Sequence, residues 1–436
     1  MMLTMTAAPQ SVRLCDILQK PDGAHACAHG MVHTVRDLGD VRFVLLRTAD
    51  GVLQCVAGAD APVPQEGDAV RVQGVCAREP RAPGGLELHL DRLQILSTPA
   101  QPLPVAIDKF KMNLSMDTDL ALRPITLRNL KKRAVFKLQE GIVRGFRECL
   151  QAEGFTEIHT PKINRSGAEG GANIFKLEYF GRKAYLAQSP QFYKQTMVGV
   201  YERVFEVGPV FRAEKHNTAR HLSEYTSLDL EMGFIESFED VMRMEVKALS
   251  HILHVLGEDY APQLRTLDVT LPACEAIPAV RFDEAKQMVA ARYGRPIRDP
   301  YDLEPEEEQL IAKLFAEEYG SEFVFVTHYP SKKRPFYAKD DPADPKFTLS
   351  FDLLFRGMEV TTGGERIHDY DEQVEKIRNK GLDPEEFAAY LSIHRYGMPP
   401  HGGLGLGLER LTMKLAGLSN VREACLFPRD TQRLEP

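Results

Sequence analysis

The chain lacks the features that mark a membrane protein, a secreted protein or a small zinc-bound domain. Its seven cysteines are odd in number and scattered, and no CxxC pair occurs, so reduced thiols are expected and structural zinc is not. No stretch of 18 uncharged apolar residues is present, and residues 1–10 lack a basic segment followed by an apolar one. We therefore expect a cytoplasmic protein with no membrane partner and no secretion signal.

An excess of positive charge is also missing. Lys and Arg total 54 against 62 Asp and Glu, which gives a net charge of −8 over 436 residues. Binding to DNA through bulk charge is therefore not expected, and a nucleic-acid partner would need a local patch. The length and the 43% of hydrophobic residues favour two or three globular domains. We found no internal repeat and no low-complexity tract.

Residues 11–97 predict a small all-β domain. Short apolar bursts alternate with Gly, Asp and Pro turns at the spacing of about five strands of a barrel. The segment after them contains Pro99, Pro102 and Pro104, which favour an extended, non-helical chain. We therefore expect three parts, namely a barrel at 1–97, a linker or hinge at 98–125 and a larger domain at 126–436.

The larger domain predicts an α+β fold, in which an antiparallel sheet is flanked by helices. Apolar residues from Leu130 to Leu150 recur near a 3.6-residue period and stop at Gly154, as in a long amphipathic helix. Ser237 and Asp240 have the spacing of a capping pair ahead of a second one. The strands between the helices follow no regular βαβ order, which argues against a doubly wound parallel sheet.

One segment, residues 211–234, carries charge where a core strand should be apolar. Arg212 and Glu214 are two residues apart, so a strand would place them on one face, and the same holds for Asp229 and Glu231. The polar residues between them predict a hairpin with a basic loop and a shared charged groove. The alternative at this point is a solvated sheet face with surface ion pairs.

Three further stretches favour a functional groove. Asp352 and Glu359 lie near the ends of apolar strands, and Arg366 follows, so these carboxylates could hold Mg²⁺ against phosphates. Glycines alternate with leucines in HGGLGLGLERL, a pattern that fits poorly to a dinucleotide-binding turn and better to a strand that another group approaches closely. The stretches SGAEGGANIF and AYLAQSPQFYKQ could equally be surface loops.

Together these stretches resemble the class II aminoacyl-tRNA synthetases. GFTEIHTPKI resembles their motif 1, FRAEKHNTARHLSEYTSLDLEMGF motif 2 and GLGLGLERL motif 3, while the barrel resembles the anticodon-binding OB-fold of subclass IIb. The details FRAE, QSPQFYKQ, ERIHDYD and LFPRD resemble the aspartyl-tRNA synthetases of the archaeal and eukaryotic type. Glu231 and Glu359 are only 128 positions apart, which leaves too little room for the large insertion of the bacterial type.

The resemblance implies how ATP would be held. Arg212, Glu359 and Arg410 are the implied catalytic residues, with Arg212 on the α-phosphate and Tyr225 and Arg410 around the adenine. Glu214 would receive the adenine amino group, and Arg220 and His221 would reach the γ-phosphate side. Mg²⁺ would be the cofactor, ligated by Asp352, Glu359 and Thr362.

The resemblance also implies how the amino acid would be chosen. Lys194 and Arg366 would bind the side-chain carboxylate of aspartate, and Glu169, Gln191 and Asp229 would bind its α-amino group, with Thr362 close by. Two buried cations that face a neutral amide would lack a counter-charge, so aspartate could be separated from asparagine without an editing site.

The last implication concerns tRNA. Phe43, Gln54 and Glu87 match the anticodon contacts of the family, and His33 with Pro83 matches the pairing in enzymes that charge both tRNA(Asp) and tRNA(Asn). The resemblance therefore implies a homodimeric aspartate–tRNA ligase, with motif 1 as the dimer element. Two alternatives stay open, namely an enzyme restricted to tRNA(Asp) and a synthetase-like paralogue that does not charge tRNA.

Overall fold

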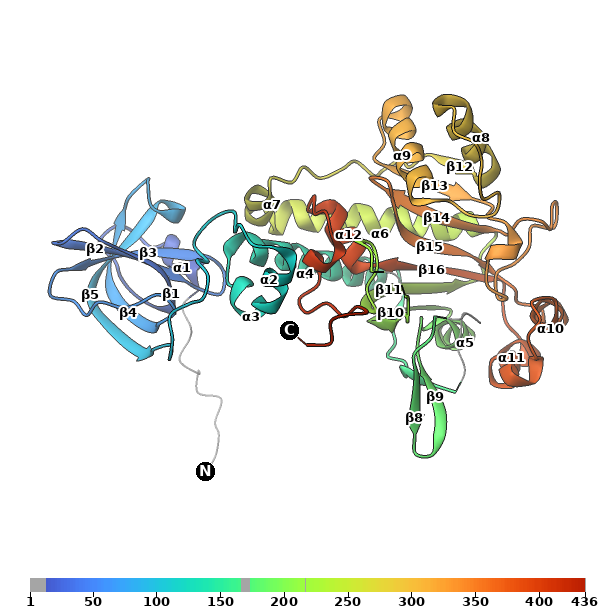
Figure 1. Ribbon diagram of the computed structural model, residues 1–436, viewed down its shortest axis with the longest axis horizontal. Helices are drawn as coiled ribbons and strands as arrows, with labels where there is room; N and C mark the ends of the chain where they lie inside the picture. Colours follow the sequence, from blue (N-terminus) through green and yellow to red (C-terminus); the bar gives the residue numbers. More distant parts are fainter. Residues whose placement is uncertain (1–12, 166–172, 216, 436) are drawn as a thin grey trace. The chain divides into compact units, whose positions relative to one another are not determined.

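The computed structural model describes residues 13–165, 173–215 and 217–435. The chain divides into two compact units, one up to Leu130 and one from Lys131 (Figure 1). Each unit has its own hydrophobic core, so each is described by itself.

The first unit is built on a closed five-stranded barrel, as the turn spacing predicted. Its neighbouring strands follow the order β1-β2-β3-β5-β4. Val44, Leu46, Leu53 and Cys55 are buried, while Leu45 of β2 and Gln54 of β3, which alternate with them, are only partly buried. The elements of this barrel are α1 (Leu14–Leu18), β1 (His25–Asp37), β2 (Val41–Arg47), β3 (Val52–Gly58), β4 (Ala69–Arg78) and β5 (Leu86–Ser97).

The segment that follows β5 is more structured than an extended linker at 98–125. It carries α2 (Met116–Ala121) and α3 (Arg123–Thr126), and the compact unit continues to Leu130. Arg47 of β2 donates a hydrogen bond to the carbonyl of Arg128 at 3.2 Å, and Asn129 donates to the carbonyls of Ile107 and Lys109. The first bond ties the end of the segment to the barrel, and the Asn129 bonds tie that end back to the middle of the segment, although Pro-rich composition alone favours a loose connection.

The second unit is built on an eight-stranded sheet of order β12-β13-β14-β15-β16-β11-β10-β6. The sheet is antiparallel except at its two ends, where β12 and β6 pair in parallel with their neighbours. The strands are β6 (Thr156–Glu157), β10 (Arg203–Phe211), β11 (Glu224–Gly233), β12 (Ala279–Arg281), β13 (Phe323–Thr327), β14 (Ser350–Phe355), β15 (Met358–Arg366) and β16 (His401–Gly407).

Long helices cover one face of this sheet (Figure 1). They are α4 (Leu130–Ala152), α6 (Phe238–Asp259) and α12 (Leu408–Leu415), and the capping box of Ser237 and Asp240 begins α6 as predicted. Leu228, Leu230 and Met232 of β11 join their core. Since strand side chains alternate, Asp229 and Glu231 must face the opposite side, which the long helices leave open.

Smaller elements surround that open face. A three-stranded sheet joins β7 (Ile163–Asn164), β9 (Arg182–Leu186) and β8 (Lys176–Tyr179), and α5 (Gln191–Tyr201) packs on β10 and β11. The remaining helices are α7 (Ala261–Leu267), α8 (Phe282–Tyr293), α9 (Pro305–Tyr319), α10 (Tyr370–Asn379) and α11 (Ala388–Tyr396).

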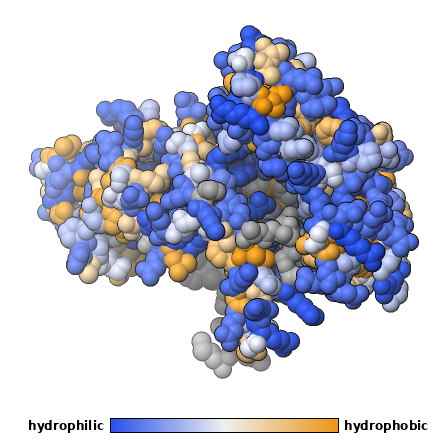
Figure 2. Space-filling model, turned by 45° about the vertical axis from the view of Figure 1, so that its right-hand side comes forward, coloured by the Kyte–Doolittle hydropathy of each residue, from blue (hydrophilic) through white to orange (hydrophobic). Residues whose placement is uncertain are grey.

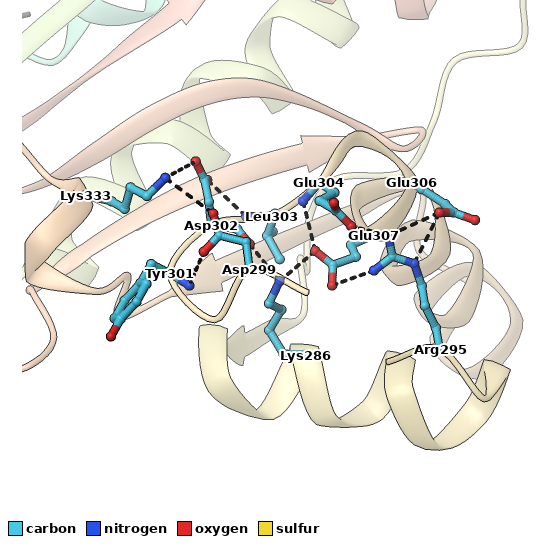
Figure 3. A network of polar contacts seen from close by, with 10 residues as sticks. All are labelled: Lys286, Arg295, Asp299, Tyr301, Asp302, Leu303, Glu304, Glu306, Glu307 and Lys333. Carbon is cyan, nitrogen blue, oxygen red and sulfur yellow. Dashed lines mark hydrogen bonds and ion pairs between the residues drawn. The ribbon is translucent and has the colours of Figure 1, made fainter. Parts of the chain in front are cut away.

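Helices α8 and α9 contribute to a separate apolar core of the second unit, and a buried ion pair lies beside this core. Figure 3 shows Lys286 of α8 pointing to Glu307 of α9, with 2.7 Å between Nζ and Oε2. Lys286 also donates to the carbonyl of Asp302 at 2.7 Å. This pair therefore fixes the loop between the two helices, which ends near the open face of the sheet.

On the face seen in Figure 2, hydrophobic side chains are scattered among hydrophilic ones. Among the helices of the described residues, none is both long enough and apolar enough to cross a membrane.

Candidate active site

A cavity of about 440 Å³ lies over the open face of the large sheet. Almost every side chain that the sequence proposed for the larger domain lines it, although these residues are spread over some 220 positions of the chain. The proposed residues in its lining are Gln191, Lys194, Arg212, Glu214, Arg220, His221, Tyr225, Asp229, Glu359, Thr362, Arg366 and Arg410. Glu169 lies outside the described residues.

The inner end of the cavity holds two cations bound to two carboxylates. Lys194 of α5 is only 2% exposed, and its Nζ donates to Asp229 at 3.0 Å and lies 3.1 Å from Glu231. Arg366, at the end of β15, donates from Nε to Glu231 at 2.9 Å. Burial alone would raise the pKa of Glu231, but Arg366 and Lys194 outweigh it and lower this pKa. The group is a neutral, preorganised set of charges rather than a solvated surface.

The glycine strand makes room for this set, as the alternation of HGGLGLGLERL suggested. Gly403 of β16 lies opposite Glu231 of β11. A Cβ at Gly403 would come within 2.0 Å of Glu231 Oε2, so no other residue fits without moving the carboxylate. Arg366 and Lys194 also donate to the carbonyls of Gly403 and Leu404. The absence of a side chain at Gly403 therefore leaves space for the carboxylate of Glu231 on the neighbouring strand.

The middle of the cavity is lined by cations around Glu359. Arg410, in the first turn of α12, donates to the carbonyl and the carboxylate of Glu359 at 3.0 and 3.3 Å. Burial would raise the pKa of Glu359, but Arg410 and Arg212 hold it below its usual value. The Arg212 guanidinium lies 5.9 Å from the ring centre of Tyr225. Strand β10 ends at Phe211, so Arg212 and Glu214 follow the strand rather than share its face.

The basic loop of the β10–β11 hairpin reaches the outer part of the cavity. His221 lies 3.2 Å from the carboxylate of Glu214, and Arg220 forms an ion pair with Glu308 of α9. Glu308 also accepts the backbone N–H of Glu359 at 3.1 Å. Burial raises the pKa of Glu308 to about 7 even though Arg220 opposes this shift. The hairpin was predicted, and the anchoring carboxylate on α9 was not.

Two carboxylates and a hydroxyl lie where a divalent cation was expected. Asp352 of β14 is paired in register with Thr362 of β15, and the Thr362 hydroxyl donates to Glu359 at 3.3 Å. Burial and the nearby Glu359 raise the pKa of Asp352 to about 6, although Arg334 opposes this shift. Among the described residues no group of three or more His, Cys, Asp or Glu side chains converges as a metal cage.

This donor set fits Mg²⁺ better than a structural metal. Mg²⁺ is usually held by one or two carboxylates together with waters and substrate phosphates. The phosphates would have to approach along the arginines that border Glu359. Asp352 itself is buried behind the cavity lining and is held by Arg334 at 2.8 Å.

Sequence reasoning missed three residues that the cavity depends on, namely Glu231 as a shared anchor of Lys194 and Arg366, Glu308 and Arg334. The charge of Glu231 was noted, but its two cationic partners lie far away in the sequence. Arg334 follows two lysines in a polar stretch, which reads as a solvated surface.

The barrel unit carries a second set of proposed residues on its outer face. Gln54 of β3 and Glu87 of β5 are register partners, and the amide of Gln54 donates to Glu87 at 2.8 Å. His89, two residues on, lies 2.8 Å from the other oxygen of Glu87. Phe43 of β2 is half-buried and lies opposite Val56 of β3, on the same outer face. An aromatic ring, an amide and a carboxylate thus lie on one face of the barrel, where Glu87 itself is only 9% exposed.

The structure does not place His33 on a comparable surface. His33 is only 2% exposed, beside a register shift of β1 between Val32 and Thr34. Pro83, by contrast, is exposed at the start of the short 3₁₀ turn Pro83–Gly85. Contact of both residues with tRNA therefore stays a prediction, and His33 could act only from beneath the surface.

The site and the fold define a class of protein. The family model of tRNA synthetases class II (D, K and N) matches residues 115–431. The chain belongs to this family.

Its curated relatives match over nearly the whole length. The chain is 48% identical over 425 residues to the aspartate–tRNA(Asp/Asn) ligase of Deinococcus radiodurans, covering 96% of this chain and 97% of the relative. It is 40% identical over 433 residues to the aspartate–tRNA(Asp) ligase of Pyrococcus abyssi, covering 97% and 98%.

Solved structures agree with the fold. The asparaginyl-tRNA synthetase of Pyrococcus horikoshii, in complex with asparaginyl-adenylate, superposes with a TM-score of 0.89 at 31% identity over 98% of this chain and all of that one. The aspartyl-tRNA synthetase of Entamoeba histolytica superposes with a TM-score of 0.86 at 28% identity over 98% and 93%. The predicted barrel and class II domain are thereby confirmed.

Proposed function

We propose that this chain is an aspartate–tRNA ligase that activates aspartate with ATP and transfers it to tRNA, and that it accepts both tRNA(Asp) and tRNA(Asn). The observation that carries the choice of amino acid is the buried pair Lys194 and Arg366 at the inner end of a cavity whose middle is lined by arginines. Relatives of nearly equal length that are named for the same reaction support it.

In the first step, an oxygen of the aspartate α-carboxylate attacks the α-phosphorus of ATP. A new P–O bond forms, the bond to the bridging oxygen of the β-phosphate breaks, and pyrophosphate leaves. Arg212 would bind the α-phosphate, where negative charge develops, and a guanidinium fixed in advance favours that transition state. Tyr225 and Arg410 would hold the adenine, with Glu214 on its amino group. Arg220 and His221 would bind the outer phosphates.

Mg²⁺, held by Asp352, Glu359 and Thr362, would neutralise charge on the phosphates when it is bound. The Thr362 hydroxyl already contacts Glu359, so the chain keeps these oxygens together by itself. Arg410 keeps the Glu359 carboxylate ionised and oriented through two hydrogen bonds. This holds the carboxylate in the form that a cation needs.

Selection of aspartate would follow from charge at the inner end of the cavity. Lys194 and Arg366 would take the side-chain carboxylate, and Asp229 with Gln191 and Glu169 would take the α-amino group. Because the two cations are buried, a neutral carboxamide would leave them without a new counter-charge. Asparagine would be rejected on these grounds, since a site that is built for a charged group discriminates strongly against its neutral analogue.

In the second step, a hydroxyl of the terminal ribose of tRNA attacks the carbonyl carbon of aspartyl-adenylate, and AMP leaves. The barrel would read the anticodon, with Phe43 stacking on an unstacked base and Gln54 and Glu87 hydrogen-bonding to base edges. Acceptance of tRNA(Asn) is supported by two relatives at 48% identity that are named for both tRNAs, while further relatives named for both lie at 39–42%, in the same range as the 39–40% of those named for tRNA(Asp) alone.

A homodimer is part of the proposal. The outward face of α4, the helix just before motif 1, lines an open hollow together with Leu426, and Phe136 and Val143 contribute apolar surface there. Leu426 and Phe427 are exposed hydrophobic residues next to it. A second copy would bury this surface.

The proposal is tested by aspartate-dependent exchange of pyrophosphate into ATP, followed by charging of tRNA(Asp) and tRNA(Asn) transcripts side by side. Exchange with aspartate but not with asparagine, and charging of both transcripts, is the expected result. Charging of tRNA(Asp) alone would identify a discriminating enzyme. Exchange without charging of either transcript would identify a paralogue that has lost tRNA transfer, and no exchange would overturn the ligase.

A further inference from the structure

Arg334 is a cation of the cavity to which the reaction outlined above assigns no part. It lines the cavity and donates from Nη2 to Oδ1 of Asp352 at 2.8 Å. Its guanidinium also lies over the ring of Tyr329, 4.0 Å from the ring centre. The side chain is only 11% exposed, so the hydrogen bond and the ring contact fix its position.

Asp352 needs such a partner because of where it lies. Its carboxylate is buried close to a second carboxylate, that of Glu359. Asp352 lies on β14 opposite Thr362, and Glu359 lies on the same strand as Thr362, β15. Asp352 is buried and the Glu359 side chain is 35% exposed, and two like charges this close repel each other more strongly where solvent is partly excluded. Arg334 engages Oδ1 of Asp352, and the side chains of Tyr329 and Thr362 also interact with this carboxylate.

We propose that Arg334 is a positioning residue for the divalent cation that accompanies ATP: it holds Asp352 by one oxygen so that the other oxygen is presented to the metal. This inference rests on the proposed metal role of Asp352 and Glu359. Carboxylates that ligate metals are themselves hydrogen-bonded by outer partners, and loss of such a partner typically lowers metal affinity about 10- to 100-fold.

The preceding residue supplies a matched comparison. Lys333 lines the same cavity, but its Nζ is paired with Asp302 at 3.3 Å and Asp299 at 3.5 Å, as Figure 3 shows. Both carboxylates lie on the loop that Lys286 and Glu307 fix. Neighbouring cations of one cavity thus serve separate sets of carboxylates: Lys333 pairs with Asp299 and Asp302, whereas Arg334 pairs with Asp352.

The backbone just before these two residues is anchored at Ser331, independently of either side chain. Lys380 donates to the carbonyl of Ser331 at 2.7 Å, Lys376 donates to its hydroxyl at 2.8 Å, and the Ser331 N–H donates to Lys346. A substitution at Arg334 should therefore leave the segment in place.

The test measures the binding of Mn²⁺ in the presence of ATP to the full-length wild type and to three variants. Binding is monitored through the electron paramagnetic resonance signal of free Mn²⁺. Arg334→Met keeps the length and the contact with Tyr329 but removes the charge and the donors. Lys333→Met removes one charge from the same cavity. Arg334→Lys keeps the charge but loses the planar, two-sided geometry.

We expect Arg334→Met to weaken Mn²⁺ binding by about 10- to 100-fold, Arg334→Lys to weaken it less and Lys333→Met to leave it within about twofold. Equal weakening by Lys333→Met and Arg334→Met would overturn the inference, because total charge alone would then explain the effect. Unchanged binding in Arg334→Met would also overturn it.

Failure of the proposed metal site and failure of the role of Arg334 give different results. A wild type that binds no Mn²⁺ with ATP would overturn the proposed metal role itself, whereas a wild type that binds it and an Arg334→Met variant that binds it equally well would overturn only the role of Arg334. If Arg334→Met lowers the thermal midpoint of unfolding, its Mn²⁺ affinity is not used, and Arg334→Lys is compared with Lys333→Met instead. Equal Mn²⁺ affinities in these two variants would count against the inference.

Discussion

Arg366 donates from Nε to Oε1 of Glu231 over 2.9 Å in the interior of the cavity, across the surface of the glycine strand. The other oxygen of Glu231 lies 3.1 Å from Lys194. One fully buried carboxylate therefore sets the spacing of both cations that we assign to the aspartate side chain. The spacing exists before any ligand arrives, which reduces the ordering required on binding.

The first prediction concerns this anchor. Glu231→Gln should raise the KM for aspartate at least about tenfold, equivalent to about 1.4 kcal/mol, because an amide cannot balance two cations and turns a donor toward one of them. The KM for ATP should change little, since Glu231 is bound by Arg366 and Lys194, whereas Arg212 and Arg410 are the residues assigned to ATP. Pyrophosphate exchange at varied aspartate and varied ATP measures both constants.

Glu206→Gln is the matched control for that experiment. Glu206 is also a buried carboxylate paired with a lysine, Lys162 at 2.7 Å, but neither residue lines the cavity. An equal rise of the aspartate KM in both variants would mean that general loosening, and not the anchor, is responsible.

The second prediction concerns the charge of the pocket itself. Lys194→Leu should abolish activation of aspartate while ATP binding persists, because the side-chain carboxylate would lose one of its two cations. The variant should also lose stability, by about 3–5 kcal/mol, since Asp229 and Glu231 would keep their charges in a buried site with one cation fewer. Equilibrium binding of ATP and urea unfolding are measured alongside exchange. Persistent activation of aspartate would refute the assignment of Lys194.

Much of this site could be predicted from the sequence because strand alternation is local. The pattern of β11 placed Leu228 and Leu230 on one face and Asp229 and Glu231 on the other, and the structure has them so. Alternation does not say which distant charges meet. Glu231 and Arg366 are 135 positions apart, so their contact depends on the order of β11, β16 and β15 in the sheet.

Some features could not be predicted from the sequence for local reasons. The tRNA contact proposed for His33 stays a prediction, but its burial was not foreseen, because the register shift of β1 makes Val32 and His33 consecutive buried residues, which a period of two cannot anticipate. Arg334 was overlooked because it follows Lys332 and Lys333 outside any strand. Its partner Asp352 and its ring contact with Tyr329 are visible only in three dimensions.

The third prediction concerns the barrel. Phe43→Ala should weaken tRNA binding by about 1–3 kcal/mol, the usual contribution of one base stacked on an aromatic side chain. Pyrophosphate exchange without tRNA should stay unchanged, because Phe43 belongs to a different compact unit from the cavity. Filter binding of labelled tRNA measures the affinity. Leu96→Ala, which truncates an exposed apolar residue elsewhere on the barrel, is the control and should bind tRNA like the wild type.

The fourth prediction concerns a buried acid outside the cavity. Glu245 of α6 lies beside Thr361 on the helix-covered side of β15, and burial raises its pKa to about 8 from an ordinary 4.5. At a pH between these two pKa values, Glu245 keeps its proton in the folded state, whereas in the unfolded state it has released it. The free energy of unfolding should therefore fall as pH rises, by up to about 1.4 kcal/mol per pH unit, until pH passes the folded pKa.

Glu245→Gln removes this effect, because the amide is neutral at every pH. The unfolding free energy of the variant relative to the wild type should rise steadily from about pH 5 to about pH 8 and then level off, as followed by urea titrations at each pH. Glu258→Gln, on the exposed surface of the same helix, should show no such trend. A difference between Glu245→Gln and wild type that is independent of pH would mean that Glu245 is already ionised in the folded protein, and a buried cation would then have to be sought next to it.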